Sequence, residues 1–123
     1  MNITVFALIM LAVVFNTAAQ LFLKVGMERI GEFVFSWSNA VPVFLQIIVN
    51  PWIVSGTAIY VGSMAVWLLV LSRAPVSMAY PMSSIGYVTS AIAAYYLLSE
   101  NLSPIRILGI LVIIVGVFMI ARS

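Results

Sequence analysis

Uncharged polar side chains recur at helical spacing within the apolar parts of this sequence. Asn16, Gln20 and Lys24 follow one another at intervals of four residues, which places two carboxamides and a cation on one helical face. Carboxamides are costly in hydrocarbon unless they meet a polar partner or water. The stripe therefore predicts either hydrogen bonds between helices or the lining of a polar pocket, and its end at a cation favours the pocket.

A second group of hydroxyls surrounds a proline. Tyr80, Ser84 and Tyr87 share a helical face, and Ser83 lies beside them. Lipid tails cannot satisfy hydroxyls, so this face needs a polar partner or a wet cavity. Because Pro81 removes one backbone hydrogen bond, it predicts a kink near these side chains.

Tyr60 and Trp67 form an aromatic stripe with Gly56 and Ser63. Such a stripe serves packing more often than recognition, but Tyr and Trp also offer polar groups and ring faces suited to sugars and headgroups.

The ionisable groups lie at predicted helix ends. The carboxylates are Glu28, Glu32 and Glu100, and none lies inside a predicted span. A proton-coupled exporter needs a titratable group at depth, whereas amides and hydroxyls bind neutral polyols without exchanging protons near neutral pH. Lys24, Arg73 and Arg106 are predicted near membrane interfaces, either as topology anchors or as contacts for phosphates.

Several functions are excluded by composition. Without Cys or His, thiolate chemistry, imidazole bases and the commonest transition-metal ligands are absent, and no Tyr has a base partner. We expect no enzyme activity, no metal and no cofactor. A net charge of +2 without a basic run also argues against a nucleic-acid partner.

The elements that must position these side chains are membrane-spanning helices. With 65% hydrophobic and 7% charged residues and a mean hydropathy of +1.26, the 123 residues cannot form a soluble domain. The sequence predicts one all-α integral membrane domain over 1–123 with four transmembrane helices, the first of them retained rather than cleaved as a signal peptide. These spans are predicted at 3–23, 52–71, 76–98 and 104–121.

The segment 33–50 is predicted to contain a short interfacial or re-entrant helix between the first and second spans. Phe33, Phe35 and Trp37 are typical of an aromatic belt, and the apolar run 41–49 is too short to cross a bilayer. A rival interpretation makes 41–71 one long span, broken at Pro51.

Two further patterns concern assembly and orientation. Gly109 and Gly116 lie two turns apart on the last span, where small residues predict a helix contact in a dimer. Four spans would place Arg73 and Arg122 on one side of the membrane and the remaining Lys and Arg on the other. This near balance leaves the orientation open.

A resemblance to a known family follows from longer runs. Segment 66–82 reads VWLLVLSRAPVSMAYPM, and segment 98–104 reads LSENLSP ahead of Gly109 and Gly116. The chain resembles the short four-helix members of the drug/metabolite transporter superfamily, most of all the flippase subunits for undecaprenyl-phosphate-linked aminoarabinose. It is also similar to the small multidrug resistance exporters, but Asn16 stands where those exporters have an essential glutamate and Ser83 where they have a tryptophan. Segment 25–50, between the first two predicted spans, is longer than the connection expected in the four-helix pattern of this superfamily.

The resemblance implies a flippase subunit that moves a polyprenyl-phosphate-linked sugar, with aminoarabinose for lipid A modification as one candidate, across a bacterial inner membrane. It implies membrane lipids as surroundings and a homodimer or a heterodimer with a similar small subunit as the assembly. The residues expected to bind substrate are Asn16, Gln20, Lys24, Tyr60, Trp67, Arg73, Tyr80, Ser83, Ser84 and Tyr87, with Lys24 and Arg73 meeting the phosphate. The alternatives are an exporter of small cationic amphiphiles and a membrane subunit that only scaffolds a partner.

Overall fold

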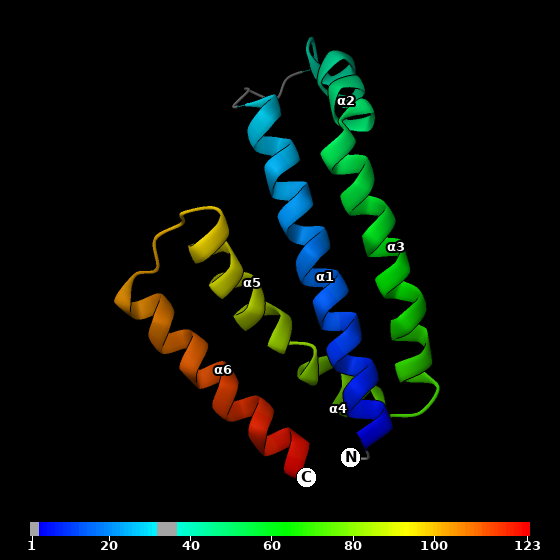
Figure 1. Ribbon diagram of the computed structural model, residues 1–123, viewed down its shortest axis with the longest axis vertical. Coiled ribbons are helices and arrows are strands. Elements are labelled where there is room, and N and C mark those ends of the chain that lie inside the picture. The colour runs from blue at the N-terminus through cyan, green and yellow to red at the C-terminus, as the bar shows by residue number, and fades with distance from the viewer. Residues whose placement is uncertain (1–2, 32–36) are drawn as a thin grey trace.

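The computed structural model describes residues 3–31 and 37–123, and all regular structure in this part of the chain is α-helical (Figure 1). The predictions for Glu32, Phe33 and Phe35 lie outside the described residues. The all-α prediction is confirmed. The helices are α1 (Ile3–Ile30), α2 (Ala40–Val49), α3 (Pro51–Leu71), α4 (Val76–Met82), α5 (Ile85–Leu97) and α6 (Pro104–Arg122).

Helices α1, α3 and α6 each have the length and apolar composition of a membrane span. Helix α1 continues well past the predicted span 3–23, since no residue between Lys24 and Ile30 breaks it. It ends at Gly31, whose φ of 86° suits a residue without a side chain and whose N–H donates to the Met27 carbonyl at 3.0 Å.

The predicted span 76–98 is not one helix, so the predicted count of four transmembrane helices plus one short helix is not confirmed. A turn at Ser83 and Ser84, just after Pro81, interrupts the α-helix, which resumes as α5; both serines keep right-handed helical φ and ψ. Pro81 has no N–H to donate, and the Ser83 hydroxyl donates to the Tyr80 carbonyl. The turn is tightened because the Tyr87 N–H bonds to the Ser84 carbonyl, three residues back, at 3.0 Å.

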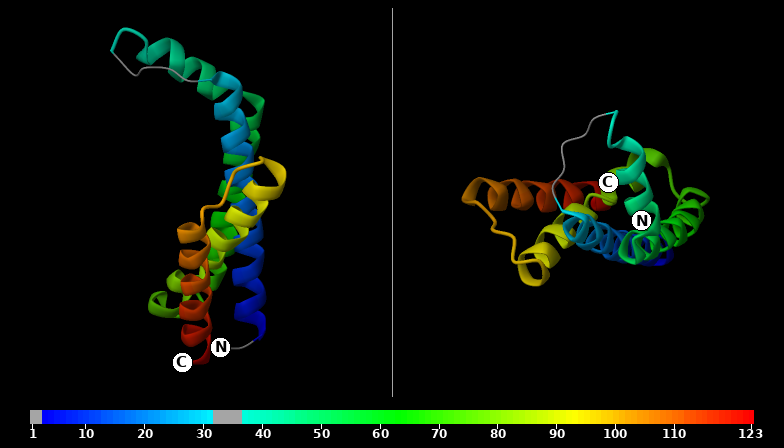
Figure 2. Two further views of the ribbon diagram at one scale, coloured as in Figure 1. Left: turned by 90° about the vertical axis from the view of Figure 1, so that its left-hand side faces the viewer. Right: turned by 90° about the horizontal axis from the view of Figure 1, so that it is seen from above.

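A single residue, Asn50, separates α2 from α3, and the chain bends there (Figure 2). Its backbone is extended, with ψ of 122°, as expected before Pro51. The Asn50 side chain caps α3 by accepting hydrogen bonds from the N–H groups of Trp52 at 2.9 Å and Ile53 at 3.2 Å. The backbone thus resembles the alternative prediction of one long helix over 41–71 broken at Pro51, except that the bend lies at Asn50. How α2 lies relative to a membrane stays a prediction.

Helices α1 and α3 pack as a tight antiparallel pair (Figure 1). Glycines allow this approach: a Cβ added at Gly56 would lie 3.0 Å from the Ala19 carbonyl oxygen, and one at Gly26 would lie 2.5 Å from Ile53 Cγ1. These contacts fix the register, with residues 19–26 of α1 level with residues 50–56 of α3.

The hydrophobic core lies where the start of α1 meets the end of α3, α4 and the end of α6. Its fully buried members are Ile9, Val70, Ala79 and Met82, and Val117 of α6 packs against them. Apart from the side chains that pack on this core, α6 is largely exposed. Nothing lies within 4 Å of a Cβ placed at Gly109 or Gly116. The predicted dimer contact at these glycines is therefore unoccupied by the chain's own helices.

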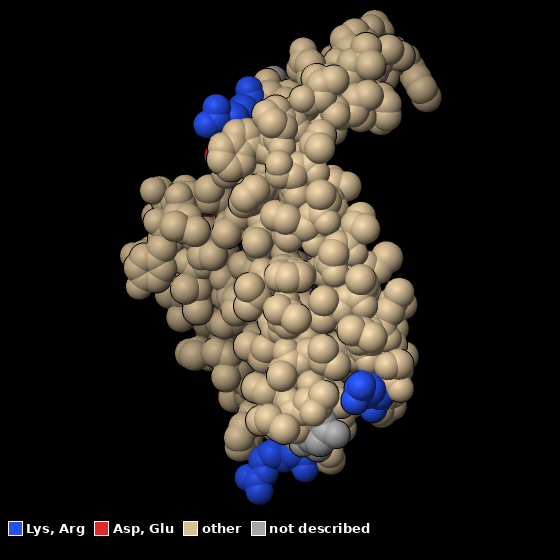
Figure 3. Space-filling model, turned by 45° about the vertical axis from the view of Figure 1, so that its right-hand side comes forward, with Lys and Arg blue, Asp and Glu red and all other residues tan. Residues whose placement is uncertain are grey.

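The Lys and Arg side chains visible on one face of the molecule lie away from its middle (Figure 3). On the face that Figure 3 draws, Lys and Arg occupy two separate ends, and none lies on the broad surface between them. This arrangement suits a protein whose middle lies in hydrocarbon and whose ends meet water and headgroups.

Candidate functional site: an uncharged polar cleft

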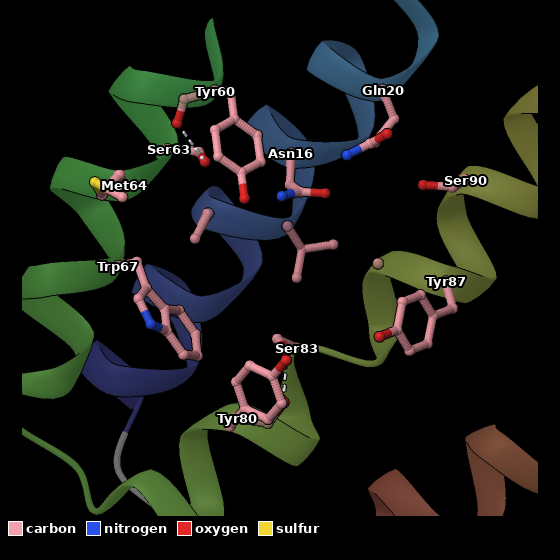
Figure 4. A pocket seen from close by; sticks show the side chains of 13 residues that line it. Asn16, Gln20, Tyr60, Ser63, Met64, Trp67, Tyr80, Ser83, Tyr87 and Ser90 are labelled. Carbon is pink, nitrogen blue, oxygen red and sulfur yellow. Dashed lines mark hydrogen bonds between the residues drawn. The ribbon is translucent and has the colours of Figure 1, made fainter. Parts of the chain in front are cut away.

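A cleft of about 580 Å³ lies between α1, α3 and the α4–α5 segment (Figure 4). Each of these elements contributes polar or aromatic side chains to it. The cleft is lined by Ala12, Val13, Asn16, Gln20, Tyr60, Ser63, Met64, Trp67, Tyr80, Ser83, Gly86, Tyr87 and Ser90.

Helix α1 forms the wall with the carboxamides. Asn16 is half-buried and Gln20 is exposed, and because they are four residues apart both point into the cleft (Figure 4). Ala12 and Val13, one turn earlier, are buried and apolar. The amides therefore stand above an apolar floor, where a bound polar group would find no competing charge.

Helix α3 contributes an aromatic wall. Tyr60, Ser63 and Trp67 share one face, and the Tyr60 hydroxyl is directed into the cleft (Figure 4). Ser63 is buried, but its hydroxyl donates to the Tyr60 carbonyl at 2.9 Å, so its donor is satisfied within the helix. The groups left to meet a ligand on this wall are the Tyr60 phenol and the two ring faces.

The α4–α5 segment forms the third wall. Tyr80 of α4 and Tyr87 of α5 lie on either side of the turn at Ser83, and both line the cleft. The rings of Tyr80 and Trp67 meet edge to face, with centroids 6.5 Å apart, at one end of the cleft. Both tyrosines are about two-thirds exposed, so the cleft is open to its surroundings.

Most of the residues predicted to bind substrate come together here, but three do not. Asn16, Gln20, Tyr60, Trp67, Tyr80, Ser83 and Tyr87 line the cleft. Ser84 lies in the turn without lining it, and Lys24 and Arg73 lie outside it. The prediction that the two cations serve this site directly is therefore not supported by the geometry.

Sequence reasoning left some lining residues out of the predicted set. Ser63 shares the predicted aromatic stripe with Tyr60, and Ser90 follows Tyr87 by three residues beside the predicted hydroxyl face, but neither serine was among the predicted binding residues. A hydrogen bond of 2.7 Å between the hydroxyls of Thr17 and Thr89, which joins α1 to α5 beside the cleft, had no signal in the sequence.

The cleft is chemically suited to hydrogen bonding rather than to charge pairing. None of its lining residues is Asp, Glu, Lys or Arg. Carboxamides offer donors and acceptors together, phenols offer both as well, and aromatic faces cover the apolar face of a sugar ring. Such a set fits a polyhydroxylated group.

Long apolar helices around an accessible, uncharged polar cleft define a multi-pass membrane protein. No protein-family model matches the chain, and no solved structure matches it significantly. Curated relatives do match. The chain is 33% identical to a probable 4-amino-4-deoxy-L-arabinose-phosphoundecaprenol flippase subunit, ArnF of Proteus mirabilis, over 87% of this chain and 84% of that one. It is 34% identical to subunit ArnE of Pseudomonas savastanoi pv. phaseolicola, over 71% of this chain and 76% of that one.

This protein belongs to the family of 4-amino-4-deoxy-L-arabinose-phosphoundecaprenol flippase subunits. The resemblance drawn from its sequence is confirmed, and with it the prediction of a transporter subunit. The relatives include both named subunits at similar identity, so the comparisons do not assign the chain to one of them. Each of these relatives is named as a subunit.

Proposed function

We propose that this protein is the subunit of a flippase that moves a polyprenyl-phosphate-linked sugar between the leaflets of a bacterial inner membrane. The lipid-linked 4-amino-4-deoxy-L-arabinose in the names of the relatives is the first candidate substrate. The observation that carries the proposal is the uncharged polar cleft, open to its surroundings, among helices that are otherwise apolar.

The physical case is a division of labour between protein and lipid. A sugar headgroup cannot cross hydrocarbon alone, because each unsatisfied hydroxyl there costs about 2–7 kcal/mol. A cleft open on one side accepts the headgroup while the prenyl chain stays in lipid. Asn16, Gln20 and the exposed phenols would exchange hydrogen bonds with the sugar hydroxyls, and the rings of Tyr60 and Trp67 would cover its apolar face. No titratable carboxylate lines the cleft, so net movement follows the gradient of the lipid itself.

In the proposed assembly each chain forms a single four-span domain. Two chains form a dimer, in which the partner is either a second copy or a similar small subunit. In this arrangement α4 and α5 together form the third span, and α2 lies at the membrane surface. Support comes from α6, whose apolar side chains are exposed and whose Gly109 and Gly116 have open space before them. Small residues let two helices approach closely. The two halves can be inserted in the same or in opposite senses.

The test is reconstitution of the protein with its partner subunit in liposomes. Loss of a labelled polyprenyl-phosphate aminosugar from the outer leaflet is measured against protein-free liposomes. We expect fast loss with the wild type. The double variant Asn16→Leu, Gln20→Met, which keeps size but removes the amides, should assemble normally and lower the rate by about tenfold or more. Protein-free rates for the wild type, or an unchanged rate for the assembled variant, would overturn the proposal, the second result pointing to a scaffold.

A further inference from the structure

Two cations lie beyond opposite ends of the uncharged cleft. Lys24 follows Gln20 by one turn of α1, on the same face as the two cleft amides. Arg73 comes just after the end of α3, six residues beyond Trp67 at the other end of the cleft. Each cation is therefore a neighbour of the cleft without being part of its lining.

The register of α1 and α3 gives the separation of these cations. Gly26 packs on Ile53 and Gly56 packs on Leu23, so Lys24 lies level with the first turns of α3. Helix α3 then runs on to Leu71, just before Arg73. At about 1.5 Å per residue, Lys24 and Arg73 are about 25 Å apart along the helix axis. This is close to the thickness of a hydrocarbon core, about 30 Å, and far too long for one phosphate to contact both.

These two cations are also the ones with the weakest ties to the protein. The Lys24 Nζ lies 3.9 Å from Glu28 Oε1, both side chains being 52% exposed, and an exposed pair at this distance contributes little. Among the described residues, Arg73 makes no ion pair. The other three cations have closer contacts: Arg29 over the Trp52 ring, Arg106 with the Asn101 carbonyl, and Arg122 over the Phe118 ring.

We propose that Lys24 and Arg73 hold the phosphate of the lipid-linked sugar in turn, one at each face of the membrane, while only the sugar occupies the uncharged cleft. This inference rests on the flippase function proposed above. The free-energy cost of leaving water without a neighbouring cation is far greater for a charged phosphate than for a neutral sugar. A cation at each end provides a charge-assisted contact in both end states, and the crossing between them is the slow step.

Two bound states in equilibrium make a specific prediction. If the phosphate rests either at Lys24 or at Arg73, removing one cation shifts the bound population towards the other end. Lys24→Gln should therefore reduce binding near Lys24 and leave or increase binding near Arg73. A single phosphate site would instead lose binding at both positions together.

The absence of Cys from the chain provides the readout. Single-cysteine variants Met27→Cys, one turn from Lys24, and Ser72→Cys, beside Arg73, are placed with the partner subunit in nanodiscs of phosphatidylcholine, where reagents reach both faces. Polyprenyl-phosphate aminosugar should protect both thiols from a polar maleimide. Adding Lys24→Gln should lower the protection of the Met27→Cys thiol about tenfold relative to that of the Ser72→Cys thiol. Adding Arg73→Gln should instead lower the protection of the Ser72→Cys thiol relative to that of the Met27→Cys thiol.

Controls separate this inference from the function it builds on. Lys24→Arg should retain protection, and Arg122→Gln, a cation already stacked on Phe118, should leave both thiols as protected as before. Equal loss at both thiols with either variant, or equal protection by phosphatidylglycerol, would overturn the two-ended phosphate sites while wild-type flipping still stands. Failure of the wild type to flip the lipid would instead overturn the flippase proposal.

Discussion

Thr17 on α1 and Thr89 on α5 share a hydrogen bond of 2.7 Å between their hydroxyls, and this bond joins two walls of the cleft. Thr89 also donates to the Gly86 carbonyl at 3.1 Å, so one hydroxyl serves both the turn of its own helix and the neighbouring helix.

A double-mutant cycle should measure this joint. Thr17→Val alone leaves the half-buried Thr89 hydroxyl with one partner fewer and should lower the free energy of unfolding by about 1 kcal/mol. Thr17→Val with Thr89→Val replaces both hydroxyls by groups of similar shape, so the double variant should lose less than the sum of the single losses. Unfolding in detergent, followed by circular dichroism, provides the measurement. Strictly additive losses would show that the bond contributes nothing.

Substitution of Gly56 should separate α1 from α3. A Cβ at this position would lie 3.0 Å from the Ala19 carbonyl oxygen, so Gly56→Val should destabilise the pair by about 1–3 kcal/mol or more. Gly62, on the same helix, has nothing within 4 Å, and Gly62→Ala should be neutral or slightly stabilising. Thermal unfolding of the two variants gives the comparison; similar losses at both positions would contradict the packing argument.

The Asn50 cap should prove stabilising through two separable contacts. Its carboxamide oxygen caps α3, and its Nδ2 donates to the Gly26 carbonyl at 3.3 Å. Asn50→Ala should lose about 1 kcal/mol of stability, whereas Asn50→Asp keeps the capping oxygen and should lose less. Ser103→Ala removes the cap of α6 without affecting a helix pair, and it serves as the matched control for denaturant unfolding.

Pro81→Ala should repair the helix and harm transport. The new N–H can donate within the turn before the break, so stability should stay the same or rise. Removing the interruption would shift α5, and with it Tyr87, relative to Tyr80 and to the α1 wall of the cleft, so we expect flux of the labelled lipid to fall several-fold. Pro104→Ala, at the first position of α6, should leave flux unchanged. Normal flux in Pro81→Ala would show that the interruption of α4–α5 is dispensable.

Collapsing the proton gradient should leave lipid flux unchanged, because no Asp, Glu, Lys or Arg lines the cleft to carry a proton in exchange for substrate. Ionophore-treated liposomes supply the measurement. If flux of a lipophilic cation instead depended on the gradient and rose in Asn16→Asp, the protein would be an exporter.

Helical periodicity was sufficient to predict the composition of the cleft but not its shape. Asn16 with Gln20, and Tyr60 with Trp67, share faces because a helix repeats every 3.6 residues, and no tertiary information is needed to see this. The break at Ser83, the Thr17–Thr89 bond and the exclusion of Lys24 and Arg73 depend on how helices pack against one another. That packing is set by contacts between distant residues, such as Gly56 on Ala19, which no local pattern records.

Helices α1 and α6 cannot match the same bilayer in the same way. At about 1.5 Å per residue, the 28 residues of α1 extend about 42 Å, whereas the 19 residues of α6 extend about 29 Å. In one membrane, α1 must lean strongly or project its last two turns, with Gly26, into the headgroup layer. Bilayer thickness therefore determines how deeply the Gln20 end of the cleft lies in the membrane. Lipids of different acyl length should change this depth without any change in the sequence.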